Sequence, residues 1–439
     1  MTRTFLIALI ALIALIVAVP ASAQDVAEPA QDAVPAQFLI ERIEVREAKR
    51  VTRDVIVAES RLREGEAYSE TELSDAAARL SRLPFLLSAD FALEKGSERG
   101  RHVLVITVAE TKPFFYLLDI RPILSERSTE GQLDLDFSDR IGGDQEGVVG
   151  ARWFVGRRGA FHAGLFTRND RHEFTQDYTA AVIGYTQYDV LGTRAFATIT
   201  LKRPLLDAPV SDEISPQLVV GIPVSMKQTV TLTYDETRFE GDIRVVEGSS
   251  FQRTSGERLV SARWSYNTTN HPFLPTRGTV VSVTPVVAWR DRVSLGLVEV
   301  TPDDRPVFGP VSFHTNSFGV SVDMARYFEL SEQSSVSVGA EAGWGQIDER
   351  NSGITIPTVR NPTFAAAQVG YSHSLWTREQ QKRGDSRFEY QLGYITRDRD
   401  FEQPFAFTLN DEYDELQASF AWVRRSSFGT IRLGVGYGW

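Results

Sequence analysis

The sequence predicts a mainly β protein, in which a transmembrane antiparallel β-barrel of about 16 strands follows a small α+β domain. Three observations lead to this prediction. Strand-like segments rich in Thr, Val, Tyr, Phe and Gly follow one another beyond Pro113, with no helical pattern between them. Their connections alternate between short turns and long loops, such as 239–255 and 290–310, which is typical of outer-membrane barrels. The third observation is the closing strand of the chain.

This closing segment alternates large apolar residues with glycines. The large residues are Leu433, Val435, Tyr437 and Trp439. Successive side chains of a strand point to opposite faces, so one face of this segment is apolar and aromatic and the other is bare. The outer face of a membrane barrel meets lipid and is ringed by aromatic residues, so a face of this kind predicts a strand of an outer-membrane barrel.

The first 36 residues predict a segment that directs export. Residues 1–23 have the pattern of a secretory signal peptide, with Arg3 before an apolar run over 5–19 and small residues at 21–23. A membrane anchor is the alternative, but the apolar run is shorter than the roughly 20 residues that span a bilayer. Residues 24–36, rich in Ala, Pro, Asp, Glu and Gln, predict a flexible leader.

Composition excludes several classes of protein. The chain of 439 residues has no cysteine, so stability must come from packing and strand pairing rather than from disulfides. The formal net charge of −11 argues against a nucleic-acid partner. A mean hydropathy of −0.19 is compatible with a barrel, because barrel strands carry polar residues at every second position.

A compact β-α-α-β-β unit is predicted over residues 37–111. Its strands are expected at Phe38–Val45, Ala89–Leu93 and His102–Val108. The first helix is expected from Thr52 to about Leu62. The second helix follows Gly65 and begins at Ser69, with Glu72 three residues later completing a capping box.

This order of elements, with Arg-Leu-Pro-Phe closing the second helix, resembles a single POTRA domain. The resemblance implies a periplasmic module that receives unfolded polypeptide by adding a strand to the edge of its sheet. The alternative is a small α+β domain that only tethers the barrel, which is predicted over residues 112–439.

A proline-rich segment separates two predicted barrel strands, ending in Pro275, Thr276, Arg277 and Gly278. Prolines stop strand pairing, and Pro-Thr-Arg-Gly favours a tight turn into a new strand. Together with the preceding Trp-Ser-Tyr-Asn, this segment resembles the periplasmic turn before the ninth strand in the BamA and TamA superfamily.

A long loop three strands later contains Thr358, Val359, Arg360 and Asn361. In the BamA and TamA superfamily the loop at this point carries a Val-Arg-Gly-Phe type motif. The resemblance implies a loop that folds back into the barrel, where its arginine packs against an acidic residue of an inward-facing strand. Asn361 departs from the glycine of that motif, and an exposed loop arginine is the alternative.

The acidic position expected from the resemblance is occupied by Gln391, counted from Gly393. Glu389 shares the face of Gln391, because both are odd positions of one strand, and it is the alternative partner of Arg360. An unpaired arginine inside the barrel would be costly, so Arg360 either meets one of these residues or pairs elsewhere.

The chain thus resembles a short, divergent member of the BamA and TamA superfamily, of bacterial surface antigen type, with one POTRA-like domain. The resemblance implies the outer membrane as location, with the N-terminal domain in the periplasm. The implied partners are the lipid bilayer and an unfolded client polypeptide or a periplasmic partner. The implied function is to capture the client and insert it into, or pass it across, the outer membrane, using a weak seam between the first and last strands.

Two other functions remain open: a passive pore or structural barrel, and a surface-loop adhesin or receptor. An enzyme is not expected, because no nucleophile elbow, phosphate-binding glycine loop or zinc motif is present. No cofactor or metal is expected, since the six histidines show no ligand spacing. His373 and Ser374 are neighbours in one strand, so they face opposite ways and form no nucleophile and base pair.

The predicted direction of the last strand bears on the number of strands in the barrel. Counted from the arginine loop, Leu433 to Trp439 runs outward and ends the wall one strand short of 16. An even barrel is restored if Phe114–Leu124 or Phe401–Leu409 contributes a further strand.

Overall fold

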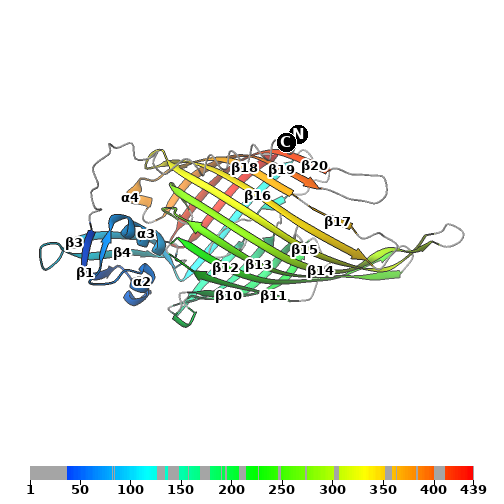
Figure 1. Ribbon diagram of the computed structural model, residues 1–439, viewed down its shortest axis with the longest axis horizontal. Helices are drawn as coiled ribbons and strands as arrows, with labels where there is room; N and C mark the ends of the chain where they lie inside the picture. Colours follow the sequence, from blue (N-terminus) through cyan, green and yellow to red (C-terminus); the bar gives the residue numbers. More distant parts are fainter. Residues whose placement is uncertain are drawn as a thin grey trace.

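The computed structural model describes residues 37–438 apart from 82, 84, 126–133, 137–147, 157, 169–177, 189, 193–194, 207–213, 226, 246–248, 272–273, 301–305, 352–357, 362, 382–383 and 400–410. The predicted signal peptide and leader, and Trp439, lie outside the described residues. The described chain folds into a four-stranded sheet with two helices, followed by a closed β-barrel (Figure 1).

The N-terminal unit (residues 37–111) contains the predicted β-α-α-β-β order and one additional short strand, β2. The sheet has the order β2-β1-β4-β3, with β1 parallel to β4 and antiparallel pairing elsewhere. Its elements are β1 (Gln37–Arg46), α2 (Arg53–Ser60), β2 (Ala67–Ser69), α3 (Glu70–Ser81), β3 (Leu86–Lys95) and β4 (Arg101–Glu110).

The start of α3 shows why the sequence folds in this way. The Ser69 backbone N–H donates to the Glu72 carboxylate at 2.8 Å, and the Glu72 N–H donates to the Ser69 hydroxyl at 3.3 Å. The predicted capping box is therefore confirmed, and it satisfies two donors that a helix start leaves without partners. Ile56, Leu80 and Ile106 then pack as fully buried side chains between the helices and the sheet.

The barrel is built from consecutive antiparallel hairpins. Its strands are β5 (Phe114–Ser125), β6 (Asp134–Asp136), β7 (Val148–Val155), β8 (Gly159–Arg168), β9 (Tyr178–Tyr188), β10 (Phe196–Leu206), β11 (Ser215–Pro223), β12 (Gln228–Val245), β13 (Ser249–Asn267), β14 (Gly278–Val300), β15 (Pro306–Glu329), β16 (Ser334–Asn351), β17 (Thr358–Arg360), β18 (Thr363–Ser374), β19 (Asp385–Arg399), β20 (Asp411–Ser426) and β21 (Gly429–Gly438). Two short helices, η2 (Val190–Gly192) and α4 (Arg378–Gln381), lie in connections.

The wall has 15 strand positions among the described residues, so the prediction of about 16 is wrong. The closed order contains 17 segments, but β6 pairs beside β7 on β5, and β17 pairs beside β18 on β16. Each hairpin reverses the chain, so an odd number of positions leaves the first and last strands running the same way. Accordingly β21 pairs with β5 in parallel, and both run away from the N-terminal unit.

The strands differ strongly in length around the barrel. Strands β7 to β11 have 8 to 11 residues, whereas β12 to β16 have 18 to 24. Two of the predicted long loops, 239–255 and 290–310, prove to be largely the paired ends of these long strands. Their polar composition concealed regular pairing, because the hairpins extend past the apolar part of the wall.

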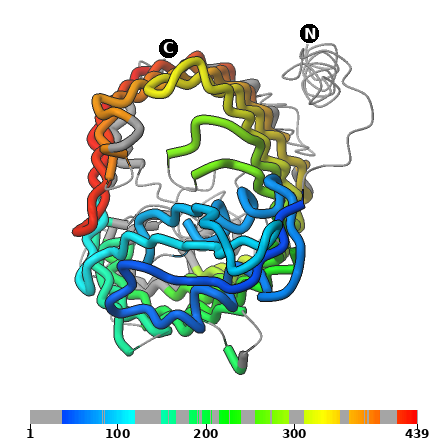
Figure 2. Tube along the Cα trace, turned by 90° about the vertical axis from the view of Figure 1, so that its left-hand side faces the viewer, coloured from blue at the N-terminus to red at the C-terminus, as the bar shows by residue number. Residues whose placement is uncertain are grey.

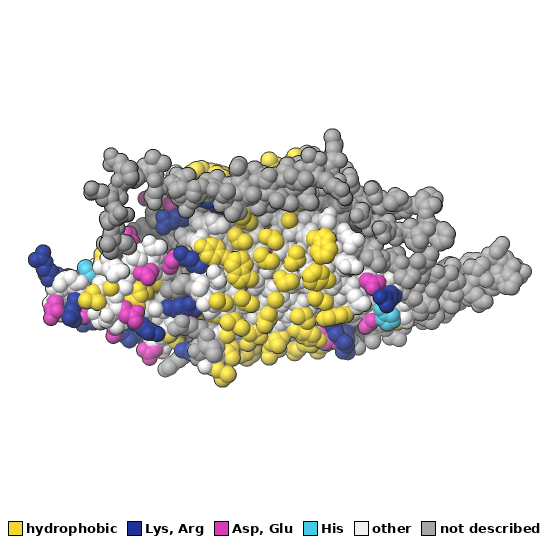
Figure 3. Space-filling model, viewed as in Figure 1, with side chains coloured by type: hydrophobic (Ala, Val, Ile, Leu, Met, Phe, Trp, Pro, Cys, Tyr) yellow, Lys and Arg dark blue, Asp and Glu magenta, His cyan; other side chains and the backbone are white. Residues whose placement is uncertain are grey.

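The outer face of the barrel carries a belt of exposed apolar side chains, with charged residues gathered toward both ends of the molecule (Figure 3). This is the surface that a membrane-spanning barrel presents to lipid. None of the helices among the described residues has the length and apolar character needed to cross a membrane. Members of the belt are Trp153, Phe161, Ile199, Leu232, Val260, Trp289, Trp344, Tyr371, Leu392 and Leu433.

The inner face is polar, and its charges are paired across strands. Lys202 of β10 contacts Asp235 of β12, and both side chains are buried. Arg290 of β14 binds Glu257 of β13, with 2.6 Å between Nη2 and Oε2. A buried charge requires a partner, so these pairs favour one register of the long strands.

Candidate functional site

The parallel seam between β5 and β21 is the first part of the candidate site. Gly429 pairs with Tyr116 and Gly438 with Ser125, but pairing is interrupted opposite Arg121 and Pro122. Proline has no backbone N–H to donate to a neighbouring strand. The seam is therefore a short ladder with a gap in its middle.

Two backbone hydrogen bonds attach the start of β5 to the turn before β21. The Lys112 N–H donates to the Ser427 carbonyl at 2.6 Å, and the Tyr116 N–H donates to the Phe428 carbonyl at 2.9 Å. Gly429 follows this turn, and a Cβ there would lie 2.4 Å from the Tyr116 carbonyl oxygen. These contacts join β5 and β21 at the end of the barrel that faces the N-terminal unit.

The residues singled out on the closing strand lie on the outer face of the seam. Leu433, Val435 and Tyr437 are 41%, 48% and 40% exposed, and they point away from the barrel. On the inner face Gly434 packs against Phe420 and Ala421 of β20, where a Cβ would lie 2.6 Å from the Phe420 carbonyl oxygen.

The two residues expected near the arginine loop have other partners. Glu389 binds Arg432 of β21, with 3.3 Å between its Oε2 and Nη2. The Gln391 amide donates to Gln368 of β18. Glu389 therefore holds the closing strand from inside the barrel, two positions from the seam.

The arginine loop itself continues the wall. Thr358, Val359 and Arg360 form β17, which pairs with Glu349, Asp348 and Ile347 of β16. The expected fold-back of this segment into the barrel is thus wrong, since its backbone takes the next places after β18 along β16. Asn361 follows as an exposed residue.

The proline-rich segment forms a turn between β13 and β14. The Asn270 side-chain oxygen accepts the backbone N–H groups of Thr276 and Arg277 at 3.1 and 3.2 Å, while Pro275 lies in the turn without strand pairing. Gly278 has φ +106°, and a Cβ there would lie 2.5 Å from the Thr268 carbonyl oxygen. Only glycine fits that position without strain.

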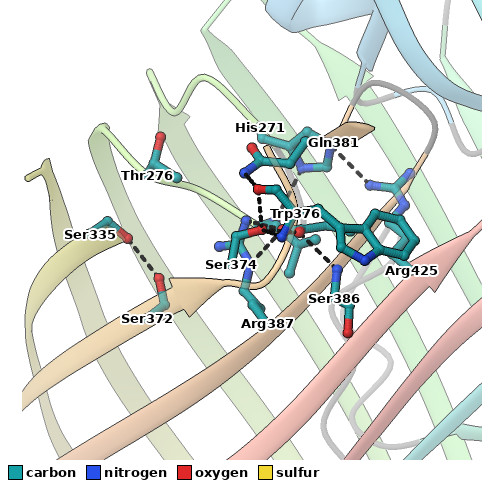
Figure 4. Close-up of polar contacts among 12 residues, drawn as sticks. His271, Thr276, Ser335, Ser372, Ser374, Trp376, Gln381, Ser386, Arg387 and Arg425 are labelled. Carbon is teal, nitrogen blue, oxygen red and sulfur yellow. Dashed lines mark hydrogen bonds and ion pairs between the residues drawn. The ribbon is translucent and has the colours of Figure 1, made fainter. Parts of the chain in front are cut away.

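His271 lies in this turn and contacts the end of β20. The His271 Nδ1 accepts the Leu274 N–H at 3.1 Å, and its Nε2 lies 3.3 Å from Arg425 Nη1 at the end of β20 (Figure 4). Burial, followed by the charges of Arg425 and Arg387, holds the pKa of His271 well below its usual value of 6.5. The neutral form of the imidazole is thus favoured beside the Arg425 guanidinium.

A buried cluster next to Arg425 fixes the start of β19. We call it the rim cluster: Ser374, Asp385, Ser386 and Arg387. Asp385 accepts hydrogen bonds from the Arg387 Nε at 2.8 Å, the Ser386 N–H at 2.8 Å and the Ser374 hydroxyl at 2.5 Å. Figure 4 shows Ser374, Ser386 and Arg387 gathered at this end of the barrel. One carboxylate thereby joins the end of β18 to the start of β19 by accepting three hydrogen bonds, one of them from a charged guanidinium.

Arg425 also connects the barrel to the N-terminal unit. Its Nη2 donates to the Leu86 carbonyl at 3.4 Å, across 339 residues of sequence. Leu86 is the first residue of β3, an edge strand of the N-terminal sheet. The edge strand therefore begins next to the hairpin that leads into the seam.

Further contacts place the N-terminal unit on the seam side of the barrel (Figure 2). The Phe85 ring packs edge-on against Phe154 of β7 and Tyr188 of β9, with centroids 6.3 and 5.9 Å away. Asp75 of α3 binds Lys227, before β12, at 2.8 Å. These contacts run along the barrel end from the seam to β12.

The two edges of the N-terminal sheet differ. Beyond β2, the edge of β1 is covered at Ile43 by two side chains that bind each other at 2.6 Å, Arg53 and Glu64. Glu64 accepts the Ile43 N–H at 3.0 Å, and Arg53 donates to the Ile43 carbonyl at 3.0 Å. This pair takes the hydrogen-bonding places of a neighbouring strand, whereas β3 lies at the edge with β4 as its only strand neighbour in the described sheet.

Sequence reasoning missed Arg425, Arg387 and Asp385. The pattern Asp-Ser-Arg at the start of a strand is common on surfaces, and nothing local distinguishes it from a solvated pair. His373 contacts the hydroxyl of Ser334, while Ser374 belongs to the rim cluster. Among the described residues, no group of three or more His, Cys, Asp or Glu side chains could hold a metal ion.

Comparisons with known proteins give a distant resemblance. No family model and no curated protein matches the chain. Solved structures that resemble it include BamA from Haemophilus ducreyi lacking POTRA domains 1–3 (8% identity, TM-score 0.32, covering 92% of this chain and 85% of that one). CdiB from Escherichia coli has 13% identity and a TM-score of 0.37, covering 94% of this chain and 89% of that one. CdiB from Acinetobacter baumannii has 8% identity and a TM-score of 0.40, covering 91% and 74%.

Proposed function

We propose that this protein is an outer-membrane assembly or translocation factor. In this proposal the N-terminal unit is a POTRA-like domain in the periplasm, and the apolar belt spans the outer membrane. The N-terminal unit captures an extended client polypeptide, and the seam passes the client into or across the membrane.

The observation that carries the proposal is the link from the edge strand β3 to the seam through Arg425. The Arg425 side chain binds the first residue of β3, while two residues later Ser427 accepts the N–H of Lys112 at the start of β5. A client strand added to β3 would therefore lie beside the end of the seam. Strand addition is a recognised mode of peptide capture, and the Arg53–Glu64 pair directs it away from β1.

The seam supplies the second step, because its two strands pair in parallel and their ladder is interrupted opposite Arg121 and Pro122. Its opening exposes two strand edges, whose donors and acceptors a client strand can satisfy inside the membrane. Enzymatic catalysis, a cofactor and a bound metal have no part in this proposal.

A reversible lock of the seam tests this function. Leu118 of β5 pairs with Ile431 of β21, and Leu118→Cys with Ile431→Cys places two thiols at this pair in a chain that has no cysteine of its own. The matched control is Val283→Cys with Val322→Cys, which locks β14 to β15 in the same way.

The expected result is that the seam lock lowers the amount of at least one outer-membrane or exported protein, measured by quantitative mass spectrometry, and that reductant restores it. The control lock should leave the same profile unchanged. An unchanged profile with the seam fully oxidised would sink the proposal.

A passive pore is the second candidate, and the position of β17 favours it. Thr358–Arg360 lie in the wall rather than inside the barrel, so this segment does not fill the lumen. Bilayer conductance separates the two functions. A steady channel that persists after deletion of residues 37–110 would support the pore, whereas small, flickering openings would support the assembly factor.

A further inference from the structure

The apolar belt gives way to charged side chains on the outer face of β12. The outward residues of this strand are Leu232 and Tyr234, both exposed, followed by Glu236 and Arg238. The strand begins next to Lys227, which binds the N-terminal unit. The change from apolar to charged residues therefore lies toward the other end of the barrel, and Figure 3 shows charged side chains beyond the belt on that side. An aromatic residue at the end of an apolar belt is typical of a membrane interface.

Glu236 holds two guanidinium groups at this interface. Arg258 of β13 is its direct neighbour across the strands. The Glu236 Oε1 accepts a hydrogen bond from the Arg238 Nε at 2.9 Å and lies 3.9 Å from the Arg258 Nε. The Glu236 side chain is only 13% exposed, whereas those of Arg238 and Arg258 are 53% and 62% exposed. One covered carboxylate thus orients two exposed guanidinium groups, with an excess of one positive charge.

An open space lies next to the two arginines, at Gly256. This glycine pairs with Arg238 of β12 on one side and with Asp291 of β14 on the other. It shares the outer face with Arg258, and a Cβ on Gly256 would have no atom within 4 Å. We call Arg238, Gly256 and Arg258 the outer notch. Across from Arg238, the Asp291 carboxylate contacts the His314 ring at 2.7 Å.

The outer notch places positive charge directly beside an apolar surface. Trp289 is the neighbour of Arg258 across the strands, and Val260 follows Arg258 toward the belt. Both are exposed on the outer face. Guanidinium N–H groups match the oxygen atoms of a phosphate, often two at a time. A ligand that fits both parts therefore has a phosphate group for the arginines and acyl chains for the belt.

We propose that the outer notch binds the phosphate headgroup of a lipid in the outer leaflet of the outer membrane. The acyl chains of this lipid lie on the belt at Val260 and Trp289. The inference goes beyond the proposed function. It rests only on the part of that proposal that places the belt in the outer membrane and the N-terminal unit in the periplasm, and it needs neither the seam nor a client.

Lipid binding to the full-length protein in detergent tests this inference. Native mass spectrometry measures the share of protein that carries a lipid as the lipid concentration is raised. The probe is diphosphoryl lipid A, and its control is the same lipid with both phosphates removed. Arg238→Gln with Arg258→Gln removes both guanidinium groups and keeps polar side chains. Arg350→Gln, at an exposed arginine of β16 that binds Asp348, is the matched control variant.

The expected result is selective loss of binding in the double variant. It should bind diphosphoryl lipid A at least about tenfold more weakly than the wild type, because it loses charge-assisted hydrogen bonds to phosphate. Arg350→Gln should bind like the wild type. The lipid without phosphates should bind equally to all three proteins, which also shows that the variants keep their apolar belt.

Two further variants separate the notch from a general effect of charge. Gly256→Leu fills the open space and leaves both arginines in place, so it should also weaken binding of diphosphoryl lipid A. Asp291→Asn removes the neighbouring negative charge and should strengthen binding. Unchanged binding in the double variant or in Gly256→Leu would overturn the inference, and so would an equal loss in Arg350→Gln or weaker binding in Asp291→Asn.

Inorganic phosphate distinguishes a lipid headgroup from the free ion. It should displace diphosphoryl lipid A only when present in large excess, because it has no acyl chains to bury on the belt. Displacement at equal concentration would show a site for free phosphate and would contradict lipid binding.

The outcome is separable from that of the proposed function. If the double variant binds diphosphoryl lipid A as the wild type does while the seam lock stops client assembly, the proposed function stands and the lipid site falls. If the double variant loses the lipid while the seam lock changes no outer-membrane protein, the lipid site stands without the assembly function.

Discussion

The arc of the barrel around the seam and the arc opposite to it are built differently. In the opposite arc, β14 pairs with β15 along its 23 residues, and charged pairs such as Arg290 with Glu257 join the inner face. At the seam, β21 has 10 residues and its ladder with β5 is parallel and interrupted. Each backbone hydrogen bond adds about 0.5–1.5 kcal/mol net, so the two arcs differ greatly in resistance to opening.

The N-terminal unit sits on the weaker arc. It contacts the barrel through Phe85, Leu86 and Asp75 along the stretch from the seam to β12. If the barrel opened between β14 and β15 instead, these contacts of the N-terminal unit would lie away from the opening. The two arcs therefore differ both in strand length and in strand direction.

The largest effect is expected from breaking the rim cluster, which joins the end of β18 to the start of β19. Arg387→Met leaves the buried Asp385 carboxylate without its counter-charge, and such a change costs about 3–5 kcal/mol. Thermal unfolding of the purified protein in detergent measures it. Arg350→Met, which breaks the exposed pair with Asp348, is the control and should cost at most about 1 kcal/mol. Equal losses in the two variants would contradict the role of the cluster.

A smaller effect is expected at the turn that leads into β14. Gly278→Ala places a Cβ against the Thr268 carbonyl at a positive φ, which costs about 1–3 kcal/mol. Gly256→Ala in β13 is the control, because no atom lies within 4 Å of the new Cβ and φ is not positive. Denaturant unfolding of both variants tests the difference, and a Gly278→Ala protein as stable as Gly256→Ala would refute it.

The contact between His271, in the turn between β13 and β14, and Arg425 should weaken in acid. The pKa of His271 is lowered in the folded state, so the contact is at full strength above the ordinary pKa of 6.5. Below pH 6.5, His271 binds a proton more readily when the turn has lost this contact than when the contact is made. The stability that the contact contributes therefore falls as the pH approaches the lowered pKa. Hydrogen exchange around Leu274 between pH 8 and pH 5 measures this. His271→Gln should remove most of the pH dependence, and an identical dependence in that variant would exclude His271 as its source.

The smallest effect is expected at the half-buried ion pair between the two units. Lys227→Ala removes the 2.8 Å contact with Asp75 and should cost about 0.2–1 kcal/mol, less at high salt. A double-mutant cycle with Asp75→Ala isolates the pair energy. A coupling well above this range would show that the ion pair, rather than the Phe85 contacts, holds the N-terminal unit.

Local patterns in the sequence predicted local structure well. The capping box at Ser69 and Glu72, the alternating strands and the turn ending at Gly278 each depend on residues close in the chain. The direction obtained for the last strand by counting strands agrees with the parallel seam. Only the prediction of an even number of strands was wrong. That prediction came from a rule about other single-chain barrels and not from the residues of this chain.

Contacts between distant residues could not be predicted. Arg425 contacts Leu86 and His271 only because the folded barrel brings the end of β20 close to the N-terminal unit and to the turn between β13 and β14. No pattern of neighbouring residues indicates either contact. Glu389 binds Arg432, since β20 lies between β19 and β21 and brings these two strands within two positions of each other. Side-chain pairing of this kind depends on register, which a pattern of apolar residues fixes only in steps of two.

Hydrogen exchange along the wall tests the difference between the two arcs most directly. The account predicts that backbone amides of β5 and β21 exchange at least about tenfold faster than those of β14 and β15, a difference of about 1.4 kcal/mol in opening free energy. The seam lock between Leu118→Cys and Ile431→Cys should slow exchange in β5 and β21 and leave β14 and β15 unchanged. Equal protection in both arcs before locking would contradict the claim that the barrel opens at its parallel seam.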